Sequence, residues 1–154
     1  MAYFLFCKNK TNSTDLHAIY ENSNDRQYYQ DRDVYEEVEV NNEDFLKIKR
    51  ASHILTGRNG SSFTWHSVKI NLEGNDHFND IHYVEDEKEW VSSELDRWIK
   101  ANPSHAKTPN IQTYKNSVDA FDPSTVSYPT SLTWGEIMEN NSIPYFCVQE
   151  LPRY

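Results

Sequence analysis

The chain of 154 residues is poor in glycine and cysteine, with four and two of them, and its apolar runs are short. Few glycines leave little material for the glycine-rich loops that hold phosphate groups. Cys7 and Cys147 form no C-x-x-C pair and lie in apolar segments, so we expect small buried hydrophobic residues. The apolar segment 2–7 is too short for a signal peptide or a membrane span, and we expect neither.

Positive charge is also scarce, because 15 Lys and Arg face 24 Asp and Glu, which gives a net charge of −9. Residues 1–72 carry nine basic and ten acidic side chains, whereas residues 73–154 carry six and fourteen. Because an acidic surface repels a phosphate backbone, we expect no nucleic-acid partner. We likewise expect no membrane partner.

Aromatic residues are abundant at 14% of the chain, and ten of them are Tyr. A domain of this length buries about 68–70% of the surface that its unfolded chain exposes, so a core can form without disulfides. Tyr combines a large apolar ring with a polar hydroxyl, which suits protein interfaces. The composition predicts a single folded domain, residues 1–154, with an aromatic-rich core or a large interface.

Alternating apolar residues and turn residues predict an antiparallel sheet in residues 1–72. The segment 2–7 is short and apolar throughout, as expected for a strand that is buried on both faces. The pair Asn59-Gly60 marks a tight turn between two later strands, since both residues tolerate a positive φ. The expected strands cover residues 2–7, 16–20, 34–40, 54–56, 63–65 and 68–70.

Two shorter features interrupt these strands. Asn42 precedes two acidic residues, which is typical of a helix start, because Asn caps the first turn and carboxylates favour the helix dipole there. Tyr28 and Tyr29 lie in a polar stretch that we interpret as a loop or an irregular strand.

The acidic stretch 75–102 predicts one long helix, capped by Asn75 or Asp76 and ended by Pro103. Lys88 is the only polar member of its inner stripe. We see two interpretations of this stripe: packing within the chain, against the sheet and the helix that contains Tyr114, or a coiled-coil seam with another copy. The stripe consists of Ile81, Val84, Lys88, Val91, Leu95 and Trp98.

Two short helices and an extended segment follow. Thr108-Pro109 is a favoured helix start, and Thr130 or Ser131 is expected to cap the last helix. Residues 143–148 read as a terminal extended segment. The predicted fold class is α+β, with an N-terminal antiparallel sheet and a short helix in a β-rich half, 1–72. The α-rich half, 73–154, holds one long helix, two short helices and the extended segment.

A metal site is the first chemistry to consider, because carboxylates and imidazoles gather before the long helix. The pattern lacks the spacing of a metal motif such as H-E-x-x-H, and polar residues at a helix start are capping or solvent-facing groups. We therefore expect no metal and no cofactor. The residues considered are His66, Asp76, His77, Asp80 and His82.

Enzymatic chemistry is the second possibility, through the acidic run of residues 85–89. Acid–base catalysis by paired carboxyls needs one group with a raised pKa in a cleft, whereas adjacent acids on a helix form a solvated face. We expect no enzyme. The alternative from that class is a small cell-wall hydrolase that uses Glu85, Glu87 and Glu89.

Aromatic side chains are the candidates for contacts with a partner, because Tyr and Trp supply most of the energy at protein interfaces. The candidate interaction residues are Tyr28, Tyr29, Trp90, Tyr128, Trp134 and Tyr145.

Several segments resemble a known group of proteins. They are Asn102-Pro103-Ser104-His105, the run Phe121 to Pro129, Ser131-Leu132-Thr133-Trp134, Gln149-Glu150-Leu151-Pro152 and the start Met1 to Asn9. With these segments the chain resembles small uncharacterised virion and assembly proteins of contractile-tailed marine phages of cyanobacteria and pelagic bacteria. The arrangement of Tyr114, Tyr128-Pro129 and Leu132-Thr133-Trp134 is also similar to the C-terminal part of tail-fibre assembly proteins.

The resemblance implies a phage virion structural protein without catalytic residues, most naturally in the tail, baseplate or fibre-attachment region. Its partners would be other virion proteins, with copies of the same chain as a further candidate. It would be found in the virion, and in the host cytoplasm during assembly. A tail-fibre assembly chaperone and a capsid decoration protein are the alternatives within this class.

Overall fold

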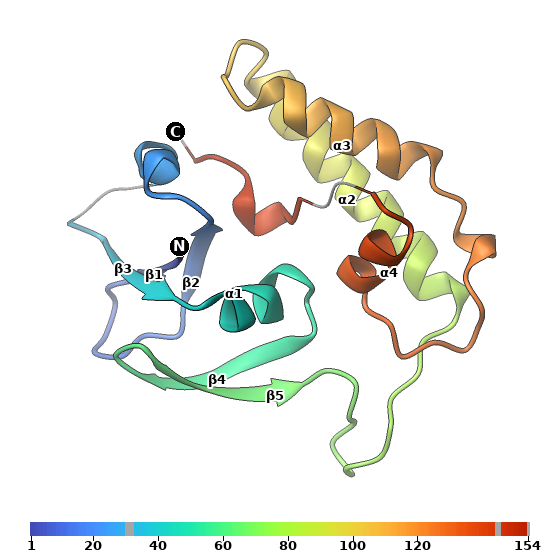
Figure 1. Ribbon diagram of the computed structural model, residues 1–154, viewed down its shortest axis with the longest axis horizontal. Helices are drawn as coiled ribbons and strands as arrows, with labels where there is room; N and C mark the ends of the chain where they lie inside the picture. Colours follow the sequence, from blue (N-terminus) through green and yellow to red (C-terminus); the bar gives the residue numbers. More distant parts are fainter. Residues whose placement is uncertain (30–32, 144–145, 154) are drawn as a thin grey trace. The chain divides into compact units, whose positions relative to one another are not determined.

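The chain forms two compact units in the computed structural model (Figure 1). The β unit comprises residues 1–68 and 149–154, and the helical unit comprises residues 69–148. The named strands lie in the β unit and the two longest helices in the helical unit, and the predicted α+β class is confirmed. The structure describes residues 1–29, 33–143 and 146–153.

A three-stranded antiparallel sheet with the order β2–β1–β3 forms the centre of the β unit. Strand β1 (Ala2–Cys7) pairs with β2 (Leu16–Tyr20) on one side and with β3 (Tyr35–Val40) on the other. Successive side chains of a strand point to opposite faces, and the neighbours Phe4 and Leu5 are both buried. The predicted burial of this strand on both faces is confirmed.

Tyrosine rings cover one face of this sheet. Tyr20 stacks on Tyr3 and on Tyr29, with ring centroids 5.3 Å and 4.9 Å apart. Tyr29 follows a 3-10 helix, η1 (Ser23–Tyr28), where we expected a loop or an irregular strand. Asn22 caps this helix by accepting a hydrogen bond from the backbone N of Asn24, and the Tyr29 ring packs in the core of the sheet.

A hairpin of β4 (His53–Asn59) and β5 (Ser62–Ser67) contacts the opposite face. The Phe63 ring of β5 lies 5.5 Å from Phe4 of the central strand. At the hairpin turn, Gly60 has a φ of 61°, which confirms the turn predicted from the Asn-Gly pair.

The short helix α1 (Asn42–Lys49) is present as predicted, but its cap is one residue earlier. Asn41, not Asn42, accepts a hydrogen bond from the backbone N of Asp44 at 2.7 Å. The sequence has two adjacent Asn residues, and either can cap a helix, so the chain direction after β3 decides between them.

The C-terminal residues return to the β unit. The hydroxyl of Tyr29 donates to the carbonyl of Glu150, and the backbone N of Arg153 donates to the carbonyl of Tyr28 at 2.8 Å. The predicted extended segment 143–148 includes residues 144 and 145, which lie outside the described residues. Its last residue begins a 3-10 turn, η3 (Val148–Glu150).

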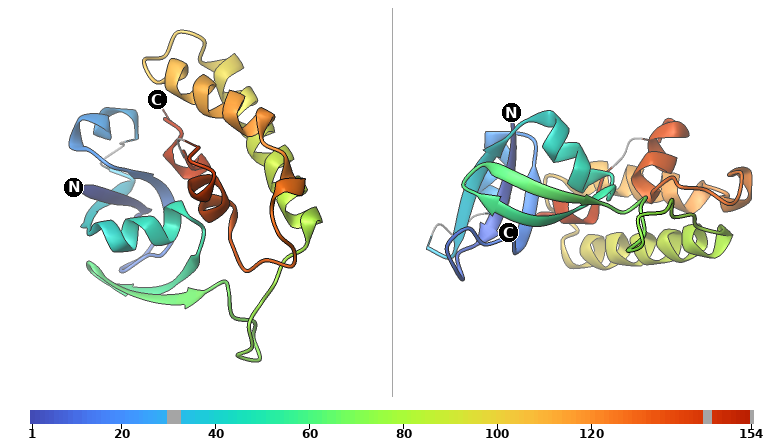
Figure 2. Two further views of the ribbon diagram at one scale, coloured as in Figure 1. Left: turned by 45° about the vertical axis from the view of Figure 1, so that its right-hand side comes forward. Right: turned by 90° about the horizontal axis from the view of Figure 1, so that it is seen from below.

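Two helices run side by side in the helical unit, α2 (Ile81–Ala101) and α3 (Thr108–Ala120) (Figure 2). The predicted stripe of α2 is present, and α2 packs along the helix that contains Tyr114, which is one of the two contacts that the first interpretation named. A third helix, α4 (Trp134–Asn140), adds three buried side chains. The buried apolar residues of the three helices are Val84, Val91, Leu95, Ile111, Tyr114, Val118, Trp134, Ile137 and Met138.

The predicted start of the long helix is wrong. Helix α2 begins at Ile81 and is capped by Asp80, whose carboxylate accepts from the backbone N of His82 at 3.0 Å. Asn75, one of the two expected caps, instead belongs to a loop, in which Asn71 accepts hydrogen bonds from the backbone N atoms of Glu73 and Asn75. Asn side chains compete with helical hydrogen bonding in this way.

The predicted caps of the two short helices are also corrected. Helix α3 has Lys107 at its cap, with Thr108 as the first helical residue. Helix α4 is capped by Thr133 rather than by Thr130 or Ser131, because Thr133 and Glu136 form a reciprocal capping box.

His17 is the titratable group in the β unit with the clearest consequence for stability. Its ring stacks on Tyr35, with centroids 4.0 Å apart, and its buried Nε2 has no hydrogen-bond partner among the residues that the structure describes. Burial, followed by the positive charge of Arg153, lowers the pKa of His17 below its ordinary value of 6.5. A neutral His17 is therefore favoured in the folded unit.

We predict that the β unit loses stability as the pH falls below about 6.5, because the unfolded chain then binds a proton that folded His17 does not accept. Urea titrations followed by the NMR signals of β1 should show this loss. The variant His17→Phe keeps a ring against Tyr35 and should flatten the dependence, whereas His66→Phe, at an exposed position, should retain it. An unaltered slope in His17→Phe would contradict the assignment.

Candidate functional site

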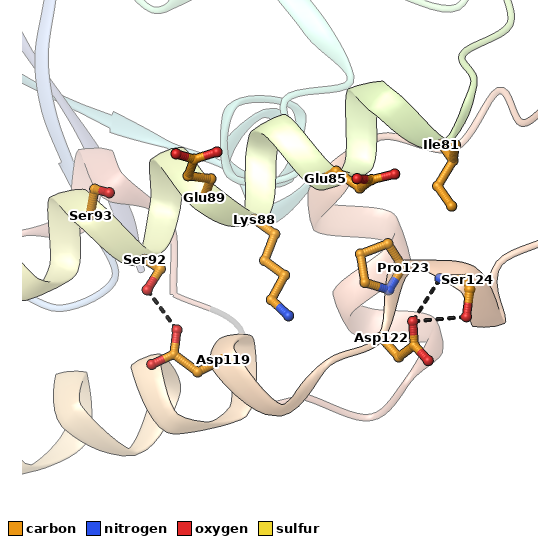
Figure 3. Close-up of a pocket in the computed structure, with 10 residues that line it drawn as sticks. All are labelled: Ile81, Glu85, Lys88, Glu89, Ser92, Ser93, Asp119, Asp122, Pro123 and Ser124. Atoms are coloured by element: carbon orange, nitrogen blue, oxygen red, sulfur yellow. Dashed lines mark hydrogen bonds between the residues drawn. The ribbon is translucent and has the colours of Figure 1, made fainter.

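A groove lies between the first half of α2 and the segment that ends α3 (Figure 3). Its cavity volume is about 620 Å³. Helix α2 forms one wall, and the last turn of α3 with the 3-10 turn η2 (Pro123–Thr125) forms the other. The lining residues are Ile81, Glu85, Lys88, Glu89, Ser92, Ser93, Asp119, Asp122, Pro123 and Ser124.

Lys88 crosses this groove and joins its walls. Figure 3 shows its side chain extending from α2 toward the segment after α3. Its Nζ donates a hydrogen bond to the carbonyl of Phe121 at 2.7 Å. Carbonyls at a helix C-terminus lack intrahelical donors and attract cations, so Lys88 is a structural link between the helices. This contact explains the one polar residue in the apolar stripe.

The second wall carries two carboxylates that are held ionised. Although burial opposes ionisation, hydrogen bonds from Lys115 at 2.7 Å and Ser92 at 2.6 Å lower the pKa of Asp119. Hydrogen bonds from the backbone N and Oγ of Ser124, at 3.0 and 2.8 Å, lower the pKa of Asp122. Both groups therefore carry fixed negative charge at neutral pH.

The first wall contributes the carboxylates of Glu85 and Glu89, which lie one helical turn apart and are exposed. Neither has a hydrogen-bond or ion-pair partner among the residues that the structure describes. Within the same part of the chain, Lys88 is the only cation that lines the groove. Of the four carboxylates at the groove, Asp119 is already paired with Lys115, and the ammonium group of Lys88 is bonded to Phe121. The carboxylates of Glu85, Glu89 and Asp122 remain to attract positive charge.

The protonation of these groups decides what the groove can do chemically. A carboxyl that donates a proton at neutral pH needs a raised pKa, whereas the pKa values of Asp119 and Asp122 are lowered. Burial and the neighbouring Asp86 raise the pKa of Glu87, but this side chain does not line the groove. The arrangement is therefore suited to holding a cationic group, such as a Lys or Arg side chain of a partner.

Three of the five residues considered as metal ligands have structural roles. Asp80 caps α2, Asp76 forms a β-bridge with Ile70, and the Nε2 of His77 lies 3.2 Å from the Oδ1 of Asn79. Within residues 1–29, 33–143 and 146–153, no group of three or more His, Cys, Asp or Glu is placed to hold a metal ion.

The six candidate interaction residues fall into different environments. Tyr29 and Trp134 are core residues, each 3% exposed, which corrects their assignment as contacts: Tyr29 packs in the tyrosine stack, and Trp134 packs against Phe121. Tyr28 and Tyr128 are half-buried, and the hydroxyl of Tyr128 donates to the carbonyl of Pro123 at 2.7 Å.

Trp90 is the member of this set that faces solvent, with 49% of its surface exposed. Tyr145 lies outside the described residues. The structure therefore does not gather the candidates into one surface: two of them belong to cores, and Trp90 stands on α2 away from the buried stripe.

The sequence did not predict that apolar side chains in residues 69–80 would be exposed. Leu72 is 95% exposed, Phe78 is 54% exposed and Ile70 is 43% exposed. The sequence placed Ile70 in a strand and Phe78 in the first turn of the long helix, where apolar residues are expected to be buried. The sequence does contain a sign of this exposure: Leu72 lies between Asn71 and Gly74, and Asn and Gly at that spacing indicate a turn, whose side chains face solvent.

Comparison of the chain with known protein families, with curated proteins and with solved structures found no match. In the described part of the chain, none of the helices combines the length and the apolar character that crossing a bilayer requires.

We predict that Lys88→Met lowers the free energy of unfolding of the helical unit by about 1–2 kcal/mol, because the Phe121 carbonyl loses its charged donor while the aliphatic stem is kept. Lys100→Met is the matched control, since Lys100 pairs with Asp96 on the exposed surface and should change stability by less than about 0.5 kcal/mol. Urea unfolding followed by Trp fluorescence measures both. Equal losses in the two variants would show that Lys88 does not link the helices.

Proposed function

We propose that this chain is a structural component of a phage virion, acting through protein–protein contacts in the tail, baseplate or fibre-attachment region. The sequence resemblance to virion and assembly proteins of contractile-tailed marine phages supports this role, through the segments 102–105, 121–129 and 131–134 among others. The chain would be present in the virion, and in the host cytoplasm while particles assemble.

The observation that carries the proposal is the exposed Trp90 on the outer face of α2. Trp90 is 49% exposed and does not line the groove; at 3.6 residues per turn it lies on a different face of α2 from Lys88 and Ser92. Asp86 and Glu94 lie one turn away on either side. A large aromatic ring among carboxylates is the composition of an interface anchor with a charged rim.

The charge of this surface defines the partner that fits it. Glu85 and Glu89 on α2 and the ionised Asp122 opposite would receive Lys or Arg side chains of a neighbouring virion protein, whereas Asp119 is already paired with Lys115. Repulsion of phosphate groups by the same carboxylates supports a protein partner over a nucleic acid. We propose that Trp90 anchors a contact with such a protein and that the groove, on another face of α2, receives its basic side chains.

Mass spectrometry of purified virions tests this function. We expect the chain in mature particles of the phage that encodes it, in a fixed ratio to a tail or baseplate protein. We also expect Trp90→Ala to reduce this ratio, because the anchor of the contact is removed from an exposed position and the fold is not disturbed. Ile54→Ala, at another exposed apolar position in the β unit, serves as the control.

Other outcomes would redirect the assignment. A chain that is abundant in infected cells but depleted from finished particles is an assembly chaperone, not a virion component. A chain that is retained in tail-less heads is a capsid decoration protein. Equal incorporation of Trp90→Ala and the wild-type chain would remove the α2 surface from the contact.

A further inference from the structure

The loop of residues 69–80, which we call the apolar loop, is built as an ordered miniature hairpin. Its centre is Asn71, whose Oδ1 accepts from the backbone N atoms of Glu73 and Asn75 at 3.1 and 2.9 Å. Gly74 occupies the left-handed region with a φ of 83°, which other residues rarely adopt. The turn is therefore specified by residues 71 and 74 and places no demand on the side chain at position 72.

Both ends of the apolar loop are fixed to the helical unit. At its start, the Nζ of Lys69 lies 2.7 Å from an Oε of Glu136 in α4. At its end, Asn79 and Thr130 exchange two backbone hydrogen bonds of 2.7 and 2.9 Å. A loop that is held in this way loses little conformational entropy when a partner binds.

The side chains that this ordered loop presents are apolar. Leu72 is 95% exposed at the turn, and Phe78 and Ile70 are 54% and 43% exposed. Single exposed apolar residues are common, but three within nine positions of one loop form a group that gains free energy when water is excluded. Any polar residue at position 72 would be compatible with the turn and better solvated.

The charge of the apolar loop restricts what can cover these side chains. Glu73, Asp76 and Asp80 are exposed carboxylates, whereas Lys69 is paired with Glu136. Anionic lipid headgroups and nucleic acid would be repelled by this charge. A second copy of the chain, with its net charge of −9, is also a poor electrostatic match.

We infer that the apolar loop is a second docking element, which inserts Leu72 into an apolar socket, rimmed by Lys or Arg, on a folded partner protein. Phe78 and Ile70 would pack at the edge of that socket, and Glu73 and Asp76 would meet the basic rim. The inference rests on the proposed function only in that the partner is sought among the proteins of a phage-infected cell.

Site-specific photo-crosslinking tests this inference with the full chain. A diazirine amino acid replaces Leu72 during infection, and the same probe replaces Ile54 of the β unit, which is 56% exposed, as the control. We expect position 72 to crosslink to one protein, at a segment that contains apolar residues together with Lys or Arg. Crosslinks to lipid, to nucleic acid or to a second copy of this chain would overturn the inference, as would equal labelling from both positions.

Binding measurements with the purified crosslinked protein add a quantitative criterion. Loss of one buried Leu contact in Leu72→Ser should weaken binding by about 10- to 100-fold. Glu73→Lys should weaken it further as the salt concentration is lowered, because repulsion by the basic rim is then less screened. Ile54→Ser should bind like the wild-type chain, and unaltered binding by Leu72→Ser would overturn the inference.

The two proposals can fail separately. If virions lack the chain while position 72 still crosslinks to such a socket, the structural role fails and the docking element stands. If virions contain the chain while position 72 crosslinks to no protein, the docking element fails and the structural role stands.

Discussion

The helical unit depends on the packing of α2 along α3. The buried stripe consists of the apolar residues Val84, Val91 and Leu95. Lys88 completes it, because its ammonium group donates a hydrogen bond to the carbonyl of Phe121, the residue that caps the end of α3. An apolar residue at position 88 could fill space but could not satisfy that carbonyl. The stripe therefore orients α2 and thereby determines which of its side chains remain in water.

The surfaces that remain outside the helical core share one electrostatic character. The groove contains carboxylates held ionised by hydrogen bonds, Trp90 stands among acidic residues, and the apolar loop combines Leu72 with neighbouring carboxylates. Each surface joins an apolar group to negative charge. The basic protein partner that we propose would satisfy both features, because its aliphatic side chains would cover the apolar group and its cationic side chains would meet the carboxylates.

The sequence predicted those elements whose signal is local and repeated. The period of α2, the doubly buried strand β1 and the Asn-Gly hairpin each follow from side-chain spacing or from turn geometry, and all are present. The start of α2 was predicted wrongly because the polar residues before Asp80 fit a helix cap and a loop equally well. The bridge of Ile70 with Asp76 and the pairing of Asn79 with Thr130 decided between them.

The candidate site was predicted only in part, for a related reason. Composition indicated aromatic side chains as candidates for contacts, but it could not separate Trp134, which is buried beside Phe121, from Trp90, which is exposed. Both residues lie on helices, next to polar and apolar neighbours alike. Trp134 is buried and Trp90 is exposed because packing against the other helices decides which face of each helix points inward.

By itself, the sequence determined the α+β class, the acidic character of the second half and the helical period of α2, because these follow from composition and from spacing along the chain. Only the tertiary structure decided that Asp119 and Asp122 face Glu85 and Glu89 across one groove, and that Leu72 stands exposed on a braced turn. Those arrangements depend on contacts between residues far apart in the sequence, such as Lys88 with Phe121 and Lys69 with Glu136. Spacing along the chain carries no record of such contacts.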